Sequence, residues 1–190
     1  FIKSIDGEVV MTSKKHDRAS DRCSEALDIV EKKLKLKFDI VLMIQGDEPL
    51  ISSKMIDDAL YPIINNKEIN VVNLRSKILT ENEFKDPNCI KVVFDQQNNA
   101  IYFSRQPIPT LKNFSKDVFK QVCVIPFRRD FLIKYNNMQP TKLEILESID
   151  MLRIIENGYK VYLAETKEKS QSVDTEADLR RVNDILNGNE

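Results

Sequence analysis

The sequence predicts one open α/β sheet domain that carries a small antiparallel β insertion. The 190 residues are 42% hydrophobic and 31% charged, a composition typical of one soluble domain with a sizeable core. Short apolar runs alternate with longer segments of helical periodicity, and one pair of extended runs flanks a polar turn. We therefore treat residues 1–190 as a single domain.

The first half of the chain alternates between expected strands and helices. A short strand is expected over 9–11, and apolar residues at helical spacing predict a surface helix over 20–37. The continuous apolar run 39–44 is typical of a strand covered on both faces within a parallel sheet. A helix over 52–60 and a strand over 69–74 follow.

The second half contains the antiparallel insertion and one further strand. Extended runs over 90–94 and 100–104 flank the polar turn 95–99, which predicts a hairpin. Alternating apolar residues over 159–163 predict the last strand. The antiparallel insertion is therefore expected between the strand over 69–74 and the last strand over 159–163.

Two capping boxes mark the starts of the last two expected helices. Thr141 and Glu144 begin one helix, which we expect to continue to Asn157-Gly158. Thr175 and Asp178 begin the final helix.

Composition excludes several classes of partner and site. The 29 basic and 30 acidic residues leave a net charge of -1, so we expect no nucleic-acid partner and only local binding of anions. One histidine and three cysteines without C-x-x-C spacing exclude zinc ribbons and make a disulfide framework improbable. A reduced, cytoplasmic setting is expected from this cysteine usage.

The four glycines permit neither a G-x-G-x-x-G fingerprint nor a Walker A loop. The sequence shows no secretory signal and no apolar run long enough for a membrane span, so we expect no membrane association. The chain begins Phe1-Ile2 without an initiator methionine, which suggests that an upstream segment is missing.

Two aspartates follow strands at positions where ligands gather in open α/β sheets. Asp47 follows the run 39–44, and Asp174 lies between the last strand and the last helix. Mg²⁺ takes one or two protein carboxylates together with substrate phosphates, so these two residues predict one metal site. Two alternatives stay open: Asp174 helps to cap a helix, and Gln45–Pro49 is only a polar turn.

Several short segments, taken in order, carry a resemblance to a known family. They are Met11-Thr12-Ser13, His16, Asp21-Arg22, Glu25-Ala26, Gln45–Ile51, Ile90–Val93, Tyr102–Pro109 and Val173–Thr175. Together they resemble the 3-deoxy-manno-octulosonate cytidylyltransferases, or CMP-KDO synthetases, over essentially the whole chain. The resemblance implies a Rossmann-like, mostly parallel sheet and a nucleotidyltransferase for lipopolysaccharide or capsule biosynthesis. Such an enzyme couples CTP to the anomeric hydroxyl of a 3-deoxy-ulosonic acid and releases pyrophosphate.

The resemblance also implies roles for individual residues. Asp47 and Asp174 take the magnesium positions. The implied sugar-acid residues are Gln45, Arg105, Gln121 and Asp150. The implied nucleotide residues are His16, Ser20, Asp21 and Arg22. For His16 a purely local hydrogen bond is an equal alternative, and Arg105 could instead pair with an acidic side chain.

The chain departs from the family pattern at several positions. Ala19 stands where the family has a glycine, Gln121 replaces a histidine, and Asp150-Met151 replaces a Glu-Gln pair. These changes predict that the acceptor is a 3-deoxy-ulosonic acid that need not be KDO itself, such as an amino- or deoxy-substituted relative.

No residues match the family's N-terminal triphosphate loop. We therefore expect the domain to lack its N-terminal nucleotide-binding portion, and these residues alone to bind CTP poorly and to be inactive. The rival hypothesis is a non-catalytic binding or assembly module that has lost this loop.

A homodimer is expected from the resemblance. The insertion from about 90 to 128 carries Ile108, Phe114 and Phe119 on an otherwise polar stretch. Burial between two subunits would cover these side chains.

Overall fold

The computed structural model describes residues 1–16, 18–115 and 117–188. Its strands are β1 (Ile40–Ile44), β2 (Val72–Lys77), β3 (Lys91–Phe94), β4 (Ala100–Ser104), β5 (Phe119–Val122), β6 (Val124–Arg128) and β7 (Tyr162–Glu165). Its helices are the 3₁₀ turn η1 (Ile2–Ile5), α1 (Ala19–Leu34), α2 (Ser53–Asn65), α3 (Glu81–Lys85), α4 (Arg129–Asn136), α5 (Lys142–Glu147), α6 (Met151–Glu156) and α7 (Glu176–Leu186).

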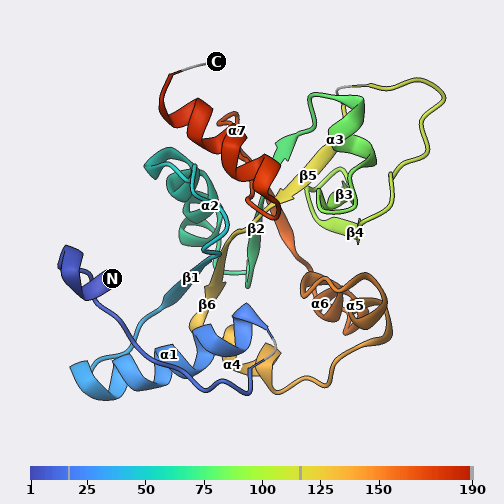
Figure 1. Cartoon of the computed structure of the whole chain (residues 1–190). Coiled ribbons are helices and arrows are strands. Elements are labelled where there is room, and N and C mark those ends of the chain that lie inside the picture. The colour runs from blue at the N-terminus through green and yellow to red at the C-terminus, as the bar shows by residue number, and fades with distance from the viewer. Residues whose placement is uncertain (17, 116, 189–190) are drawn as a thin grey trace.

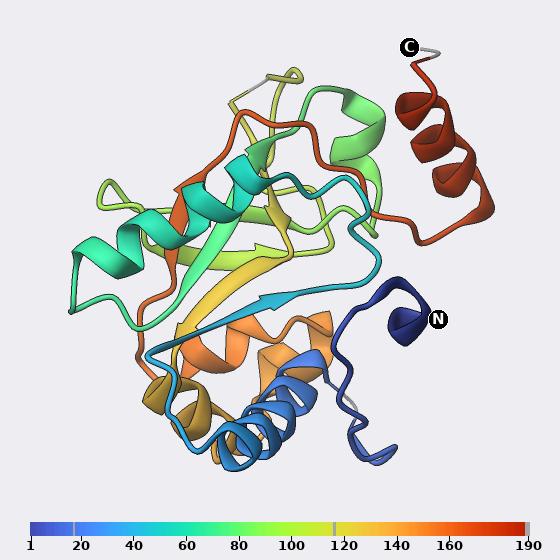
Figure 2. The same cartoon turned by 90° about the vertical axis from the view of Figure 1, so that its left-hand side faces the viewer.

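Helices cover both faces of the sheet (Figures 1 and 2). On one face, α2 packs its buried residues Met55, Ala59 and Ile63 against β2, β6 and β7. On the other face, α1, α4 and α6 enclose the larger core, which includes Phe127 and Leu152. The α/β class predicted from the sequence is therefore confirmed.

Strand directions in the sheet are mixed. β2 pairs in parallel with β7, whereas β5 pairs antiparallel with β2 and β6 antiparallel with β1. β1, β2 and β7 consequently run in the same direction. β6 runs opposite to them between β1 and β2, and β5 runs opposite to β2 between β2 and β3. The expectation of a mostly parallel sheet is thus too simple, because the chain enters β5 from a loop and not from a crossover helix.

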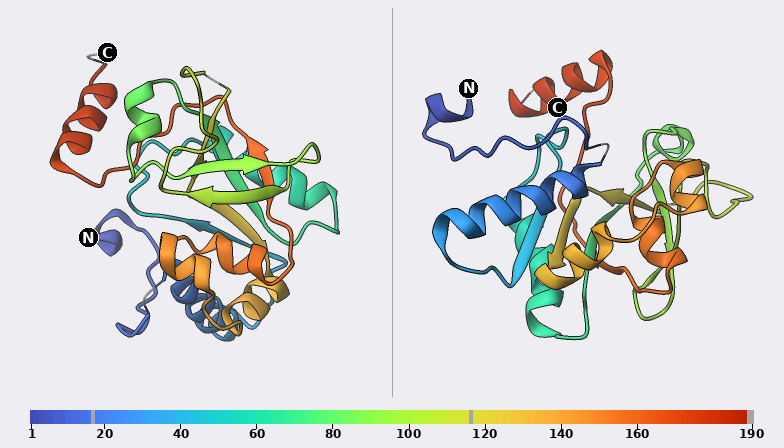
Figure 3. Two further views of the ribbon diagram at one scale, coloured as in Figure 1. Left: turned by 90° about the vertical axis from the view of Figure 1, so that its right-hand side faces the viewer. Right: turned by 90° about the horizontal axis from the view of Figure 1, so that it is seen from below.

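The hairpin of β3 and β4 forms as predicted and reaches back to β7 (Figure 3). The main chain of Ala100 donates to Val161 at 2.8 Å, and Leu163 donates to Asn98 at 2.7 Å. The hairpin turn is therefore fixed against the last strand.

Two local expectations are wrong. No strand forms over 9–11, where Met11 is 82% exposed and no neighbouring strand supplies hydrogen bonds in the described part of the chain. The helix expected from Thr141 to Asn157 is divided into α5 and α6, because Ser148 adopts a left-handed conformation with φ 55°.

The apolar side chains of the insertion are partly covered within the chain itself. Phe114 lies against Phe84 at 6.1 Å between ring centroids, and Phe119 lies edge-on to Phe94 at 5.3 Å. The premise that a second subunit must cover them is therefore wrong. In the described residues, no helix is both long enough and apolar enough to cross a membrane.

Candidate active site

The turn after β1 meets the segment before α7 and brings two predicted residues together. The carbonyl of Asp47 accepts a hydrogen bond from the main chain of Val173 at 2.9 Å, one residue before Asp174. Both aspartates line one cavity of about 890 Å³, and their shared metal site stays a prediction. The same cavity is lined by Gln45, Arg105 and Gln121, three of the four residues predicted to bind the sugar acid.

The carboxylate of Asp47 fits a divalent cation. Its Oδ1 is buried without a hydrogen-bond partner, which is costly unless a ligand completes the site. The exposed Asp174 accepts a hydrogen bond from Ser172 Oγ at 3.2 Å through Oδ2. No group of three or more His, Cys, Asp or Glu side chains in the described residues could hold a metal. Two carboxylates nevertheless suit Mg²⁺, which takes its other ligands from phosphates and water.

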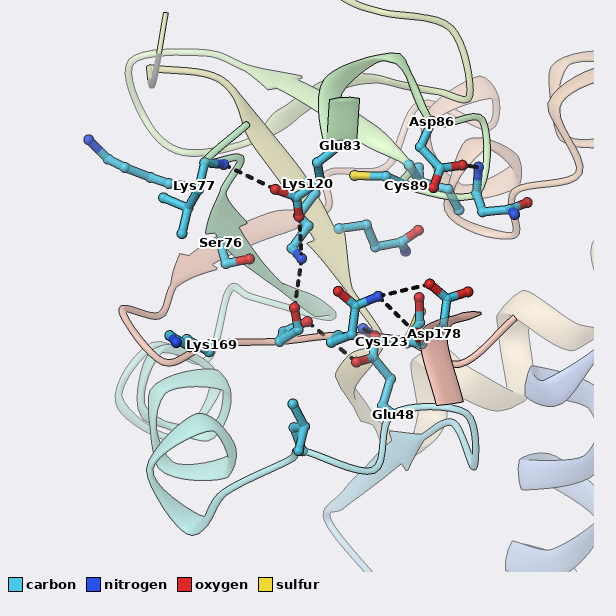
Figure 4. A pocket seen from close by; sticks show the side chains of 18 of the residues that line it. Glu48, Ser76, Lys77, Glu83, Asp86, Cys89, Lys120, Cys123, Lys169 and Asp178 are labelled. Carbon is cyan, nitrogen blue, oxygen red and sulfur yellow. Dashed lines mark hydrogen bonds and ion pairs between the residues drawn. The ribbon is translucent and has the colours of Figure 1, made fainter. Parts of the chain in front are cut away.

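Glu48 fixes the turn that presents Asp47. It is 8% exposed, and its carboxylate accepts from the main chain of Cys123 at 3.3 Å and from Ser170 Oγ at 3.4 Å. Burial raises the pKa of Glu48, and burial together with the charge of Glu48 raises the pKa of Cys123. Figure 4 shows Glu48 beneath Cys123 in the cavity wall. Sequence reasoning placed no function on Glu48.

Lys120 lies on the same wall and was also not singled out from the sequence. Its ammonium pairs with Glu83 at 2.7 Å and donates to the carbonyl of Ser170 at 2.8 Å (Figure 4). The side chain is only 12% exposed, so this pair is shielded from water. Lys120 thereby ties the segment before α7 to α3. A lysine within a strand that begins with Phe119 and ends with Val122 is the signal that the sequence offers for this role.

Arg105 is held by main-chain carbonyls. Its guanidinium donates to Glu147 at 2.8 Å, Pro87 at 3.0 Å and Ser148 at 3.4 Å. Among the described residues it forms no ion pair, so the alternative of a structural acidic partner is not observed. An arginine held in this way keeps its charge available to an anion in the cavity.

Gln121 lies on β5 and lines the cavity, and its side chain is held by a hydrogen bond to β2. Its Nε2 donates to Oδ1 of the fully buried Asn73 at 2.6 Å. That bond directs the amide nitrogen of Gln121 toward β2. Among the described residues the amide oxygen of Gln121 accepts no hydrogen bond, so it is the group available to a ligand.

Asp150 does not line the cavity. It lies at the start of α6, where Oδ2 accepts from Ser20 Oγ at 3.0 Å and Oδ1 lies 3.5 Å from Arg18 Nε. Burial raises the pKa of Asp150, and its charge acts on Cys123 in the cavity wall. The structure thus joins Asp150 to the N-terminus of α1. Its predicted contact with the sugar acid stays a prediction.

His16, Asp21 and Arg22 likewise do not line the cavity. His16 Nε2 hydrogen-bonds Glu25 Oε2, which is the local role considered as an alternative. Arg22 donates to Thr12 Oγ1 at 3.2 Å and to the carbonyl of His16 at 3.3 Å. His16 and Arg22 thus order the loop before α1, and the predicted nucleotide contact of all three residues stays a prediction.

Comparison with known proteins agrees with this arrangement. A family model described as cytidylyltransferase matches residues 1–169. A 3-deoxy-manno-octulosonate cytidylyltransferase of Geobacter metallireducens is 36% identical over 193 residues, covering 95% of this chain and 74% of that protein. The enzyme of that name from Fusobacterium nucleatum is 39% identical over 184 residues, covering 96% of this chain and 73% of that protein.

Solved structures share the fold of this chain. A CMP:2-keto-3-deoxy-manno-octonic acid synthetase complexed with CTP superposes with a TM-score of 0.85 at 29% identity, over 100% of this chain and 76% of that one. A putative glucose-1-phosphate thymidylyltransferase from Bacillus anthracis has a TM-score of 0.61 at 14% identity, over 93% of this chain and 64% of that one, and shows the fold alone. With the family model and the two curated relatives, these findings show that the chain belongs to the cytidylyltransferase family of nucleotidyltransferases.

Proposed function

We propose that this protein transfers CMP from CTP to KDO or a closely related 3-deoxy-ulosonic acid and releases pyrophosphate. The observation that carries the proposal is the meeting of Asp47 and Asp174 in one cavity with Arg105 and Gln121. The names of the curated relatives, and of the solved relative that holds CTP, support the same reaction.

Different residues of the cavity would bind the metal, the acceptor's carboxylate and the sugar hydroxyls in such a transfer. Asp47 and Asp174 would hold Mg²⁺, which neutralises the triphosphate and acidifies the attacking hydroxyl. Arg105 binds the carboxylate of the acceptor through the two guanidinium N–H groups that remain after its bonds to three main-chain carbonyls. Gln121 and Gln45 hydrogen-bond to sugar hydroxyls, and this set orients the anomeric oxygen toward the α-phosphorus.

No side chain is required to act as general base in this scheme. The buried carboxylate of Glu48, in the cavity wall, already accepts two hydrogen bonds and stabilises the turn that carries Asp47. Asp150 would act on the acceptor from beneath the cavity wall. The loop carrying His16, Ser20, Asp21 and Arg22 would contact the nucleotide.

The experiment is pyrophosphate release by the full product of the source gene, supplied with CTP, Mg²⁺ and a panel of ulosonic acids. We expect release with KDO or one related acid and none without an acceptor. Absence of release with every acid, from protein that binds CTP, would refute the proposed reaction.

We further propose a homodimer and a role in lipopolysaccharide or capsule biosynthesis, both on the strength of the resemblance. Static light scattering at working concentration tests the dimer, and a monomeric mass would contradict it. The non-catalytic alternative is not favoured, because the family match is accompanied by an intact pair of carboxylates in the cavity.

A further inference from the structure

The ammonium group of Lys91 is buried and, among the described residues, donates only to main-chain carbonyls. Lys91 is the first residue of β3 and is 0% exposed. Its Nζ donates to the carbonyls of Asp86 at 2.8 Å, Cys89 at 2.7 Å and Arg105 at 2.5 Å. These bonds use all three donors of the ammonium. Burying a cation without an ion-pair partner costs free energy that an apolar side chain would avoid, so this lysine requires an explanation.

The three carbonyls belong to the two segments that support one functional side chain. Asp86 and Cys89 lie on either side of Pro87, whose carbonyl accepts from Arg105 Nη1 at 3.0 Å. The third acceptor is the carbonyl of Arg105 itself. Lys91 therefore ties the main chain of Arg105 to the loop on which its guanidinium rests.

Glu147 holds the same arginine from the opposite side. Its Oε2 accepts from the main-chain N–H of Arg105 at 2.9 Å, and its carbonyl accepts from Nε at 2.8 Å. The direction of the guanidinium thus depends on two supports, one buried under the loop and one at the end of α5.

We propose that Lys91 is a positioning residue that sets the direction of the Arg105 guanidinium toward the carboxylate of the acceptor. This inference rests on the proposed function, in which Arg105 binds that carboxylate. Lys91 does not line the cavity, so it acts through Arg105 and not on the substrate. Its loss therefore weakens use of the acid and leaves use of CTP unchanged.

The test is Lys91→Met in the full product of the source gene, with KM measured separately for KDO and for CTP. We expect the KM for the acid to rise about tenfold to 100-fold, since small misplacements of an orienting group have effects of this size. The KM for CTP should stay within about twofold. In an Arg105→Ala background, Lys91→Met should add little, because residues that act as one unit are not additive. Equal rises for both substrates, or fully additive losses, would overturn the proposal.

Arg128→Met is the matched control. Arg128 is a cation that also donates to main-chain carbonyls, those of Ile63 at 2.7 Å and Asn66 at 3.0 Å, but it does not line the cavity. We expect its KM for the acid to equal that of the wild type. A rise as large as that of Lys91→Met would mean that the effect reflects general stability, and the proposal would fail.

A measurement without substrate separates this inference from the proposed function. The Nε–H of Arg105 should give a slowly exchanging ¹⁵N NMR signal in the wild type, which Lys91→Met should abolish. A signal unaffected by Lys91→Met refutes the positioning role, whereas a protein that accepts no ulosonic acid refutes the proposed reaction. If Lys91→Met does not fold, Lys91→Gln, which keeps a polar side chain beside the three carbonyls, replaces it with the same two readouts. An unchanged KM for the acid together with an unchanged signal then overturns the proposal.

Discussion

Removal of Arg153 should destabilise the protein severely, because it would leave a carboxylate buried without its partner. Arg153 donates to both oxygens of Glu144, at 2.7 Å and 2.5 Å, and joins α6 to α5. The two residues are 4% and 1% exposed. Breaking a pair this deeply buried costs about 3–5 kcal/mol. Thr141 N–H still donates to Glu144 at 3.2 Å and Arg18 Nε lies 3.9 Å from Glu144 Oε1, which places the expected cost near the lower end.

The assay is thermal unfolding of Arg153→Met followed by circular dichroism. In a domain of this size each kcal/mol lowers Tm by about 2–4 °C, so the predicted fall is about 6–20 °C. The double variant Glu144→Gln with Arg153→Met should recover more than half of the loss, because no charge is then left buried.

Lys32→Met is the matched control for that assay. Lys32 pairs with Asp28 at 2.6 Å, but their side chains are 74% and 62% exposed, so the change in Tm should be about 2 °C or less. If Arg153→Met lowers Tm no more than Lys32→Met does, the reasoning from burial is refuted.

Three further predictions concern pH, capping and specificity. The paired hydrogen bonds from Arg129 lower the pKa of Glu31 from 4.5 to about 2, so their stabilisation is complete above pH 4.5 and is lost as the pH falls toward 2. Acid unfolding should therefore begin at higher pH in Glu31→Gln than in the wild type, and coincident curves would contradict this. Thr175→Ala should lower the free energy of unfolding by about 1 kcal/mol in urea titrations, because it removes the cap of α7. Gln121→His combined with Met151→Gln should shift kcat/KM toward KDO in competition assays, unless the wild type already prefers KDO.

Local signals in the sequence predicted those elements whose determinants lie within a few residues. The capping boxes at Thr141 and Thr175 both form, and the polar turn 95–99 does join an antiparallel pair. A common location for Asp47 and Asp174 could be predicted from the sequence, because both residues follow strands that run in the same direction.

The remaining features depend on contacts between distant segments. The residues near 9–11 give no sign that this segment lacks a strand to pair with. The antiparallel direction of β5 and β6 follows from the loop through which the chain enters β5. The interruption at Ser148 is favoured by tertiary bonds, since the carbonyls of Glu147 and Ser148 accept from Arg105. Lys91 and Glu48 form hydrogen bonds with main-chain groups of other segments. Such bonds do not depend on the partner's residue type, so no sequence pattern predicts them.

Asp47 and Asp174 are proposed to form one divalent-metal site, on which the proposed reaction depends. The most direct test of this site is to titrate the full product of the source gene with Mn²⁺ in the presence of CTP. Electron paramagnetic resonance then measures the bound and free Mn²⁺. We predict that Asp47→Asn and Asp174→Asn each weaken binding strongly, that the double variant is little worse than either, and that circular dichroism stays unchanged. Wild-type affinity in either single variant would contradict a shared site.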